Sequence, residues 1–367
     1  MASLTARGVW ERKGFAGKLL GSLLWPASIA YSVVAQLRNG FFTRRWIKSV
    51  RLPRPVISVV NLTVGGTGKT PTCLWLAGEL RRKGLKVAIL SRGYRRKQKQ
   101  PVILRPCKLS GDMTQNEDEL AQAGDEPLMM ARLYEQTVGV GADRVQSAHE
   151  LLRHEAGIDA FILDDGFQHR HVKRDVDLLL LGSDCSGAVL PAGPFREPLR
   201  NLRRGDYWLI TGAETHWRRY LPPDRSDAVF SGTLQPLDLI TYDARRWKHY
   251  PLSMLHHSKI MTVAAIANPH NFYQAIHEWE GQIVHTLEFP DHHAYNAADW
   301  QEISRMARLV DLIVTTEKDI LKLIRFPFAR DKLLALRVGM VVTDGNRLVS
   351  ALAARIRQAQ AVNHDVG

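Results

Sequence analysis

Short apolar runs alternate with longer amphipathic stretches between about residues 55 and 235. The apolar runs read PVISVVNL, KVAIL, AFIL, DLLLLG and DYWLIT, and stretches such as TCLWLAGELRRKG separate them. Continuous apolar runs are typical of strands that are covered on both faces, and the intervening stretches have the length and mixed composition of helices. The pattern therefore predicts an α/β fold with a mostly parallel sheet flanked by helices.

The same alternation returns after about residue 236. Its apolar runs are KIMTVAAI, GQIVHTLEF, LVDLIVTT and KLLALRVGMVV. We expect a second, smaller α/β lobe there, with the seam near residues 234–252, where Pro236 and Pro251 stand among polar residues. The predicted organisation is an N-terminal helix over residues 1–40, a first domain over residues 41–235 and a second domain over residues 236–367.

The N-terminal run at residues 19–37, LLGSLLWPASIAYSVVAQL, carries no charge and has basic residues on both sides. A spanning helix needs roughly 20 mainly apolar residues, and Pro26 and several serines make this run a poor hydrocarbon segment. Its polar residues recur at spacings near four, which gathers most of them on one side of a helix. We expect an amphipathic helix that lies in a membrane interface, with its basic flanks on anionic headgroups. A helix that packs on the protein's own core is the alternative; a signal peptide is disfavoured because basic charge also follows the run.

Composition changes this picture in one respect. The chain has 367 residues, 45% of them hydrophobic, which is enough to bury a substantial core, and its three cysteines form no C-x-x-C pair. A formal net charge of +13 implies an acidic partner, which is a nucleic acid, an anionic membrane or a phosphorylated substrate. No nucleic-acid recognition motif is found, and much of the basic charge flanks the apolar N-terminal run, so anionic lipid is the favoured partner.

A candidate phosphate-binding loop, TVGGTGKT at residues 63–70, directly follows the first apolar run. The usual pattern is G-x-x-x-x-G-K-[ST], and Thr63 stands where its first Gly belongs. An apolar strand before the loop and Pro71 in the first turn of a helix after it give the context that such a loop requires. The expected nucleotide-binding residues are Thr63, Val64, Gly65, Gly66, Thr67, Gly68, Lys69 and Thr70, with Lys69 on the β- and γ-phosphates and Thr70 on Mg²⁺.

Two short motifs carry pairs of adjacent acidic residues. Asp164 and Asp165 end the run AFILDD, where adjacent carboxylates repel unless a cation or partner lies between them, so we expect them to hold Mg²⁺. One Asp capping a helix is the alternative. In GDEPLMMA, Asp125 and Glu126 precede Pro127 at what reads as a helix start, and by itself this pattern is equally consistent with a simple cap.

The ordered set of motifs resembles one family. SVVNLTVGGTGKTP, LSRGYRRK, GDEPLMMA, FILDDGFQHR, LPAGPFREP, FPDHHAY and VTTEKD look like those of tetraacyldisaccharide 4'-kinase, the lipid A kinase of Gram-negative bacteria. The resemblance implies a P-loop NTPase-like fold and a phosphotransferase with an alcohol acceptor. It implies transfer of the ATP γ-phosphate to the 4'-hydroxyl of a tetraacyldisaccharide 1-phosphate, giving lipid IVA at the cytoplasmic face of the inner membrane.

The resemblance also implies roles for single residues. Asp125 would be the base that accepts the proton of the sugar hydroxyl, and a His of FPDHHAY would pair with it; His292 is favoured over His293, but both remain candidates. Gln168 would orient ATP or the waters of the metal. Arg92, Arg95 and Arg170 would meet the 1-phosphate of the substrate or the phosphates of the nucleotide, which suits the planar guanidinium group.

Two rival readings share the phosphate-binding loop. A GTPase would need a guanine-reading motif, N/T-K-x-D, and TTEKD at residues 315–319 does not match it because its Lys and Asp are adjacent. A nucleic-acid-binding ATPase would explain the net charge, and salt-dependent DNA binding without lipid-stimulated turnover would favour it.

Overall fold

The computed structural model describes residues 6–10, 14–44, 46–65, 67–93, 96, 98–106, 113–166, 170–184, 187–243, 246–326 and 332–364. The chain forms two compact units, each assembled from separate segments. Unit 1 contains residues 1–90, 144–233 and 340–367, and unit 2 contains residues 91–143 and 234–339. Strands β8 (Val229–Asp243) and β13 (Leu333–Val342) contribute residues to both units. The expected division into residues 1–40, 41–235 and 236–367 stays a prediction.

Unit 1 is built on a parallel sheet. Its strands follow the order β8-β7-β6-β1-β5-β2, and each neighbouring pair that includes β1, β5, β6 or β7 is parallel. The strands are β1 (Val56–Asn61), β2 (Val87–Ser91), β5 (Ala160–Asp164), β6 (Val176–Leu181) and β7 (Tyr207–Ile210). Apart from the N-terminal helices, the longer helices are α4 (Lys69–Arg82), α7 (Arg144–His154) and α12 (Gly345–His364), and short ones are α8 (Glu214–Arg218), η1 (Leu199–Arg204) and η2 (Pro223–Ala228). Strands β1, β5 and β6 are buried throughout, as their continuous apolar runs predict.

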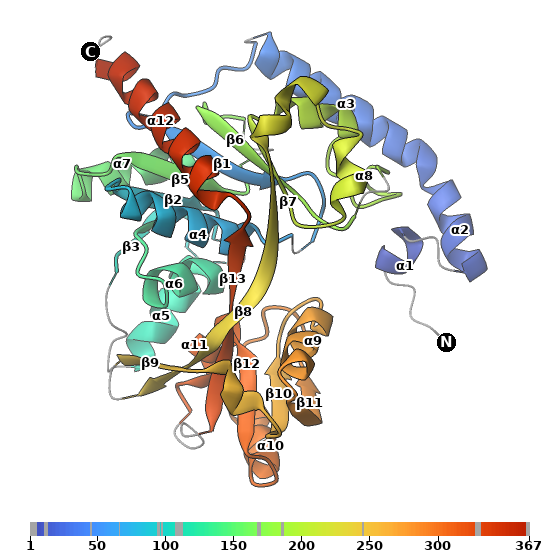
Figure 1. The fold of residues 1–367 in the computed structure, drawn as a ribbon, viewed down its shortest axis with the longest axis vertical. Coiled ribbons are helices and arrows are strands. Elements are labelled where there is room, and N and C mark those ends of the chain that lie inside the picture. The colour runs from blue at the N-terminus through green and yellow to red at the C-terminus, as the bar shows by residue number, and fades with distance from the viewer. Residues whose placement is uncertain are drawn as a thin grey trace. The chain divides into compact units, whose positions relative to one another are not determined.

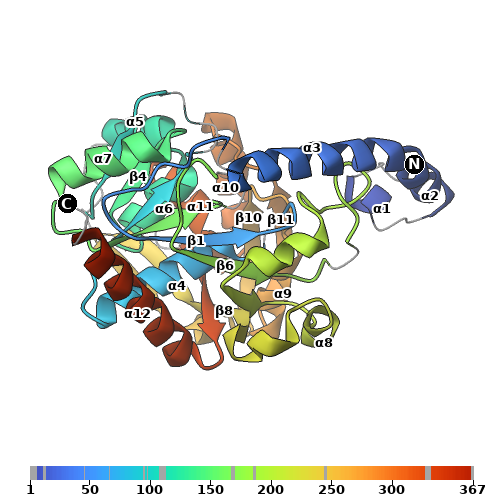
Figure 2. The same cartoon turned by 90° about the horizontal axis from the view of Figure 1, so that it is seen from above.

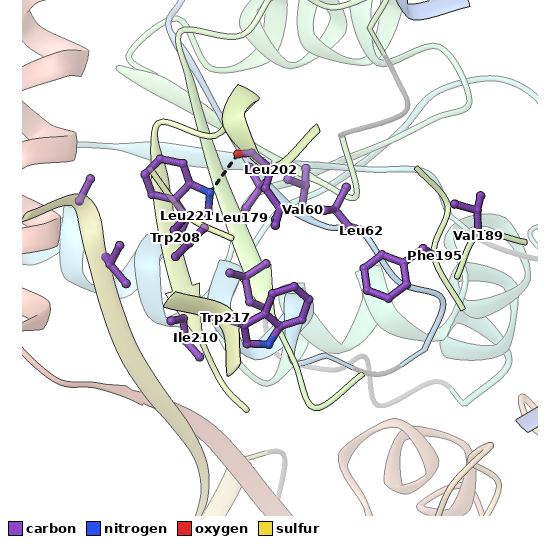
Figure 3. Packing of buried hydrophobic residues seen from close by; sticks show 13 residues of the cluster. Val60, Leu62, Leu179, Val189, Phe195, Leu202, Trp208, Ile210, Trp217 and Leu221 are labelled. Atoms are coloured by element: carbon purple, nitrogen blue, oxygen red, sulfur yellow. Dashed lines mark hydrogen bonds between the residues drawn. The ribbon is translucent and has the colours of Figure 1, made fainter. Parts of the chain in front are cut away.

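One apolar cluster of unit 1 fills the space beside β1, β6 and β7 (Figure 3). Trp208 and Trp217 are its largest members, and both are buried. Each indole still satisfies its N–H group, because Trp208 donates to the Leu202 carbonyl at 3.0 Å and Trp217 donates to the Gly182 carbonyl at 2.7 Å. The cluster therefore anchors the turns after β6 and before β7 to the sheet.

Unit 2 contains a second parallel arrangement, with the order β11-β10-β12-β13. Its strands are β10 (Lys259–Ala264), β11 (Gln282–Glu288) and β12 (Leu312–Thr316), and its helices include α9 (His270–Glu278), α10 (Ala297–Ala307), α11 (Glu317–Leu323) and η3 (Leu252–Leu255). Strand β9 (Arg246–Tyr250) pairs antiparallel with β8, and β3 (Val102–Leu104) pairs antiparallel with β4 (Val138–Val140). Residues 91–143 add α5 (Met113–Ala123) and α6 (Asp125–Arg132). Helices α6 and α11 lie side by side, although they are far apart in the chain (Figures 1 and 2).

The predicted fold class, α/β with a mostly parallel sheet flanked by helices, is confirmed. The expected strands at PVISVVNL, AFIL and DLLLLG are β1, β5 and β6, and TCLWLAGELRR lies in α4. A strand that is covered on both faces of a sheet has no side that faces solvent, so its sequence does not alternate with polar residues. Continuous apolar runs therefore form these strands.

The N-terminal segment forms α1 (Ala6–Trp10), α2 (Gly14–Leu23) and α3 (Trp25–Thr43). Helix α3 extends beyond β1 and β6 and carries α2 and α1 at its far end (Figure 2). Apolar side chains on α2 and α3 are exposed, among them Leu23, Val34 and Leu37. Within the described ranges no single helix is long and apolar enough to cross a membrane; α2 and α3 together meet that test by length and composition, with a bend of 46° between them.

The polar side of α3, not its apolar side, contacts the rest of unit 1. The Ser28 hydroxyl donates to the Val189 carbonyl at 2.8 Å and accepts from the Ala192 N–H at 2.8 Å, and both groups are buried. The Asn39 side chain donates to Glu197 Oε2 at 3.1 Å. These contacts attach α3 to residues 189–197, which belong to the LPAGPFREP motif.

Candidate active site

The phosphate-binding loop leads from β1 directly into α4. Gly65 and Gly68 have φ values of 121° and 84°, a region that side chains rarely tolerate, so the turn requires glycine at these two positions. Lys69 begins α4 and donates to Asn61 Oδ1 at 3.0 Å, while Asn61 Nδ2 donates to Thr67 Oγ1 at 2.8 Å. A residue at the end of β1 thus holds both the loop and its lysine.

The position of Thr63 explains why a Gly is not needed there. Thr63 is buried and forms an antiparallel bridge with Phe195, and the Val64 N–H donates to the Pro194 carbonyl at 2.8 Å. A bridged residue has an extended backbone that any amino acid adopts. Gly66, the middle glycine of the predicted set, lies outside the described residues, as do Gln168 and Arg95.

Asp164 ends β5 beside the same loop. Strand β5 pairs with β1 with Val59 opposite Asp164, so this carboxylate lies at the sheet edge from which the loop leaves. Its Oδ1 lies 3.9 Å from the thiol of Cys73 on α4. Burial, and then the charge of Asp164, raise the pKa of the Cys73 thiol well above its ordinary value. Cys73 is therefore a neutral neighbour of the carboxylate.

Asp165 has a different environment from Asp164. Its φ of 54° is in the left-handed region, and both of its side-chain oxygens accept from Arg196 Nη1, at 3.1 and 2.9 Å. Burial alone would raise the pKa of Asp165, but the charges of Lys69 and Arg196 hold it below its ordinary value. The sequence predicted no role for Arg196 or Asn61, although Arg196 belongs to the LPAGPFREP motif.

The donor set at this edge suits a magnesium ion. Thr70 contributes a hydroxyl, and Asp164 and Asp165 contribute carboxylates, which are the hard oxygen ligands that Mg²⁺ takes. Asp164 lies beside α4, the helix that begins with Lys69 and Thr70. The three residues proposed for the metal lie at the end of β5 and the start of α4, and their oxygen atoms are of the kind that Mg²⁺ binds; the ion would share Asp165 with Arg196.

A second group of candidate residues lies within unit 2. Asp125 begins α6, its Oδ1 accepts from the Glu126 N–H at 3.1 Å, and its Oδ2 lies 2.7 Å from Nδ1 of His292. Burial alone would raise the pKa of Asp125, but the hydrogen bond from His292 and the charge of Lys322 hold it well below its usual range. The same hydrogen bond raises the pKa of His292 above its ordinary value. The pair is thus an ionised carboxylate beside an imidazole that binds its proton more tightly.

The neighbouring His293 takes no part in that pair. Its Nε2 lies 2.8 Å from Asp299 Oδ2, and its ring stacks on Phe289 with ring centres 4.8 Å apart. Asp299, the third residue of α10, also accepts from the N–H of Asn296, the N-cap, at 2.8 Å. Of the two adjacent histidines, His292 is the one that meets Asp125.

The arginines predicted for phosphate binding occupy separate places. Arg92 is exposed. Arg170 donates to the Asn39 carbonyl at 2.8 Å, and its guanidinium lies 5.4 Å from the ring centre of Phe42, so it contacts the last turn of α3. Burial, together with the charges of Arg204 and Arg174, lowers the pKa of Arg170 to about 10. A phosphate-binding role for Arg92, Arg95 or Arg170 stays a prediction.

Comparison with known proteins assigns the chain. The family model described as tetraacyldisaccharide-1-P 4'-kinase matches residues 20–357. The chain belongs to this family. As a member, it is an ATP-dependent kinase of lipid A synthesis, and the kinase reading predicted from the motifs is confirmed.

Relatives of the kinase cover most of its length. A tetraacyldisaccharide 4'-kinase from Syntrophus aciditrophicus is 40% identical over 321 residues, which are 82% of this chain and 84% of that protein. A tetraacyldisaccharide 4'-kinase from Pelobacter propionicus is 35% identical and covers 93% of this chain and 94% of that protein. Among solved structures, LpxK from Aquifex aeolicus in complex with ATP is 29% identical, with a TM-score of 0.74 over 92% of this chain and 99% of that chain.

Proposed function

We propose that this kinase transfers the γ-phosphate of ATP to the 4'-hydroxyl of a tetraacyldisaccharide 1-phosphate, with Asp125 as the base. The observation that carries the assignment is the 2.7 Å contact between Asp125 Oδ2 and His292 Nδ1. A sugar hydroxyl is a poor nucleophile near neutral pH, so its proton must be accepted as the phosphoryl group moves. Oδ1 of Asp125 accepts that proton, the hydroxyl oxygen bonds to the γ-phosphorus, and ADP leaves.

His292 supports this role by its geometry. Its hydrogen bond to Oδ2 orients the carboxylate and leaves Oδ1, which accepts a backbone N–H and has a further acceptor position, for the substrate. The imidazole also keeps Asp125 ionised, and the ionised form is the one that accepts a proton.

The loop of residues 63–70 is the proposed ATP site. Its backbone N–H groups and the positive end of α4 favour phosphate oxygens, and Lys69 is already held at the helix start by Asn61. Thr70, Asp164 and Asp165 would hold Mg²⁺, which when bound neutralises charge on the phosphate oxygens. Gln168 is proposed to orient ATP, as the resemblance implies.

The N-terminal helices are the proposed contact with the membrane. We infer that α2 and α3 lie in the surface of an anionic membrane, at the cytoplasmic face of the inner membrane, and that this surface rather than nucleic acid attracts the basic flanks. The exposed apolar side chains of α2 and α3 support this, because an interfacial helix presents apolar side chains to the acyl region of the bilayer.

An activity assay tests the base assignment. Labelled ATP and detergent-dispersed disaccharide 1-phosphate are given to wild type, Asp125→Asn, His292→Gln and His293→Gln. We expect Asp125→Asn to lower kcat by roughly 10²–10⁴-fold, the usual contribution of a general base. His293→Gln is the matched control, because it breaks a similarly short His–Asp contact in the same unit.

The outcomes separate the parts of the proposal. Folded, ATP-binding wild type without lipid phosphorylation would refute the reaction itself. Near-normal kcat in Asp125→Asn would refute the base and leave the reaction standing. An equal loss in His292→Gln and His293→Gln would refute the special role of His292.

A further inference from the structure

The TTEKD segment, residues 315–319, is a motif to which the proposed reaction assigns no task. It carries the chain from β12 into α11. Thr316 is the N-cap: its hydroxyl donates to Asp319 Oδ2 at 2.7 Å and accepts from the Asp319 N–H at 3.3 Å. Asp319 is fully buried, and a carboxylate is that deeply buried only when several donors satisfy it. Its remaining partners show what the segment does.

The first partner connects Asp319 to the proposed base. Lys322, one turn further along α11, lies 3.3 Å from Asp319 Oδ1 and 3.3 Å from Asp125 Oδ2. The lysine side chain is only 6% exposed. Its ammonium group thus stands between two buried carboxylates, which would repel one another without a cation between them. Asp125 Oδ2 is held from two sides, by His292 and by Lys322.

The second partner connects Asp319 to the histidine. The Ala265 N–H donates to Asp319 Oδ2 at 2.9 Å, and the Ala265 carbonyl accepts from the His292 N–H at 3.2 Å. His292 has a φ of 62°, a left-handed conformation that a residue with a side chain keeps only when its surroundings enforce it. Asp319 therefore supports the backbone that directs the His292 ring towards Asp125.

Helices α6 and α11 are joined by a second ion pair on the next turn. Lys318 binds Glu126, and Lys318 and Lys322 are four residues apart, so both lie on the face of α11 that meets α6. The adjacent acids Asp125 and Glu126 are thereby matched to two lysines of one helix face. The pairing fixes how the start of α6 lies along α11.

We propose that Asp319 and Lys322 are positioning residues that set the geometry and the protonation of the Asp125–His292 pair. This rests on the proposed role of Asp125 as the base. Lys322 holds one oxygen of the carboxylate and favours its ionised form. Asp319 holds Lys322 on one side and, on the other, the Ala265 backbone that accepts from His292, so one buried carboxylate adjusts both members of the pair.

The charged groups around Asp125 predict the direction of each change. It is faced by His292, Lys322 and Lys318, with Asp319 behind Lys322, and Asp291 lies 3.7 Å from Nε2 of His292. Removing the Lys322 ammonium removes a charge that favours the ionised carboxylate. The acidic limb of the pH–kcat profile then moves to higher pH in Lys322→Met.

Kinetics on the full-length kinase provide the first test. We expect Lys322→Met and Asp319→Asn to lower kcat by up to about a hundredfold, the cost of a misplaced catalytic group, with KM for ATP unchanged. Lys322→Arg keeps the charge and should recover part of kcat and the wild-type acidic limb. Lys332→Met is the control: Lys332 is another lysine of unit 2, and it donates to the Ala307 and Val310 carbonyls instead of a carboxylate.

Histidine NMR provides a test that does not depend on activity. The His292 signal is assigned by its loss in His292→Gln and is titrated in each variant. We expect the pKa of His292 to rise further in Lys322→Met, because a nearby cation is gone, and to fall towards its ordinary value in Asp319→Asn, because the supporting backbone contact is weakened.

The two tests separate this inference from the proposed function. If Asp125→Asn loses activity while Lys322→Met and Asp319→Asn keep the wild-type pH profile and His292 titration, the inference is overturned and the base stands. If Asp125→Asn is fully active, the base assignment fails, and the His292 titration alone decides whether Asp319 and Lys322 position the pair. Circular dichroism identifies a variant that has unfolded, and Lys322→Arg then replaces that variant in the NMR titration. A His292 pKa equal to that of wild type supports the charge-dependent role of Lys322. A fall in the His292 pKa contradicts it.

Discussion

Single side chains at the two sites are held by neighbours in positions that they would not keep alone. Asp165 and His292 both have left-handed backbones, with φ of 54° and 62°. Such a conformation costs of order 1–3 kcal/mol for a residue that carries a side chain, and it persists where surrounding contacts outweigh the cost. At Asp165 the contact is the Arg196 guanidinium, and at His292 it is the Ala265 carbonyl.

Asn61 is the side chain on which the position of Lys69 depends. Asn61→Ala removes the acceptor for Lys69 and the donor to Thr67 in one change. A hydrogen bond to a charged group is worth about 1.5–3 kcal/mol, so we expect ATP affinity to fall by about tenfold or more. Calorimetric titration with ATP measures this, with Gln274→Ala, which removes an amide contact on the exposed side of α9, as control. Unchanged ATP affinity would show that Lys69 is positioned without Asn61.

The raised pKa of His292 predicts a pH-dependent contribution to stability. Because the folded-state pKa lies above the ordinary 6.5, the contribution is fully present below the unfolded-state pKa and is lost as pH rises through the folded-state pKa. Relative to His292→Gln, wild type should therefore gain unfolding free energy in mildly acidic buffer and lose this advantage at alkaline pH. Urea unfolding of both proteins across this range measures the difference, and a difference that does not vary with pH contradicts the prediction.

At the scale of elements, α3 buries its polar side and exposes its apolar side, which is the reverse of a helix that packs on a core. Ser28 and Asn39 are buried against residues 189–197, while apolar side chains point to solvent. A helix packed on its own core would bury the apolar side instead. The spacing of polar residues along α3 was readable from the sequence, but the partner of that polar side was not, because residues 189–197 are far away in the chain.

The exposed apolar side of α2 and α3 predicts how vesicle binding can be weakened without disturbing the fold. Removing residues 1–40 would also remove the buried Ser28 and Asn39 contacts, so surface substitutions are the cleaner change. Replacing Leu23, Val34 and Leu37 with Gln should lower binding to anionic vesicles by at least about tenfold, since burial of one such side chain is worth about 1.5–3 kcal/mol. The control replaces the exposed Leu237, Val284 and Leu309 of unit 2. Equal vesicle sedimentation of both triple variants would contradict the interfacial role of α2 and α3.

At the scale of the whole molecule, neither unit is a continuous piece of sequence. Residues 91–143 carry Asp125 into the unit that contains His292, and 167 positions separate the two residues in the chain. A change in local composition shows where the pattern of apolar and polar residues changes along the chain, but it does not show which segments pack together. Apolar runs therefore predict strand positions, but they do not predict which segments pack together.

The net charge of +13 would make the proposed membrane contact sensitive to salt. Each Lys or Arg near an anionic surface is worth about 1 kcal/mol, and the attraction is screened within a Debye length of about 10 Å at 0.1 M salt. We expect binding to vesicles with anionic lipid to weaken steeply as salt rises, and binding to zwitterionic vesicles to be weak and nearly independent of salt. Salt-independent binding to both vesicle types would assign the contact to apolar burial alone.

Local chemistry was readable from the sequence alone. Apolar runs predicted β1, β5 and β6 because buried strands need no polar alternation, and the glycines before Lys69 predicted a phosphate loop because few other residues allow that turn. The ordered motifs predicted the family.

Only the tertiary structure decided which side chains meet. It paired His292 with Asp125 and His293 with Asp299, and it turned Arg170 towards α3. It also brought Arg196 to Asp165 and placed Lys322 between Asp319 and Asp125. Adjacent histidines are equivalent in a sequence, and what distinguishes them is a backbone angle and a neighbour that the chain supplies from far away.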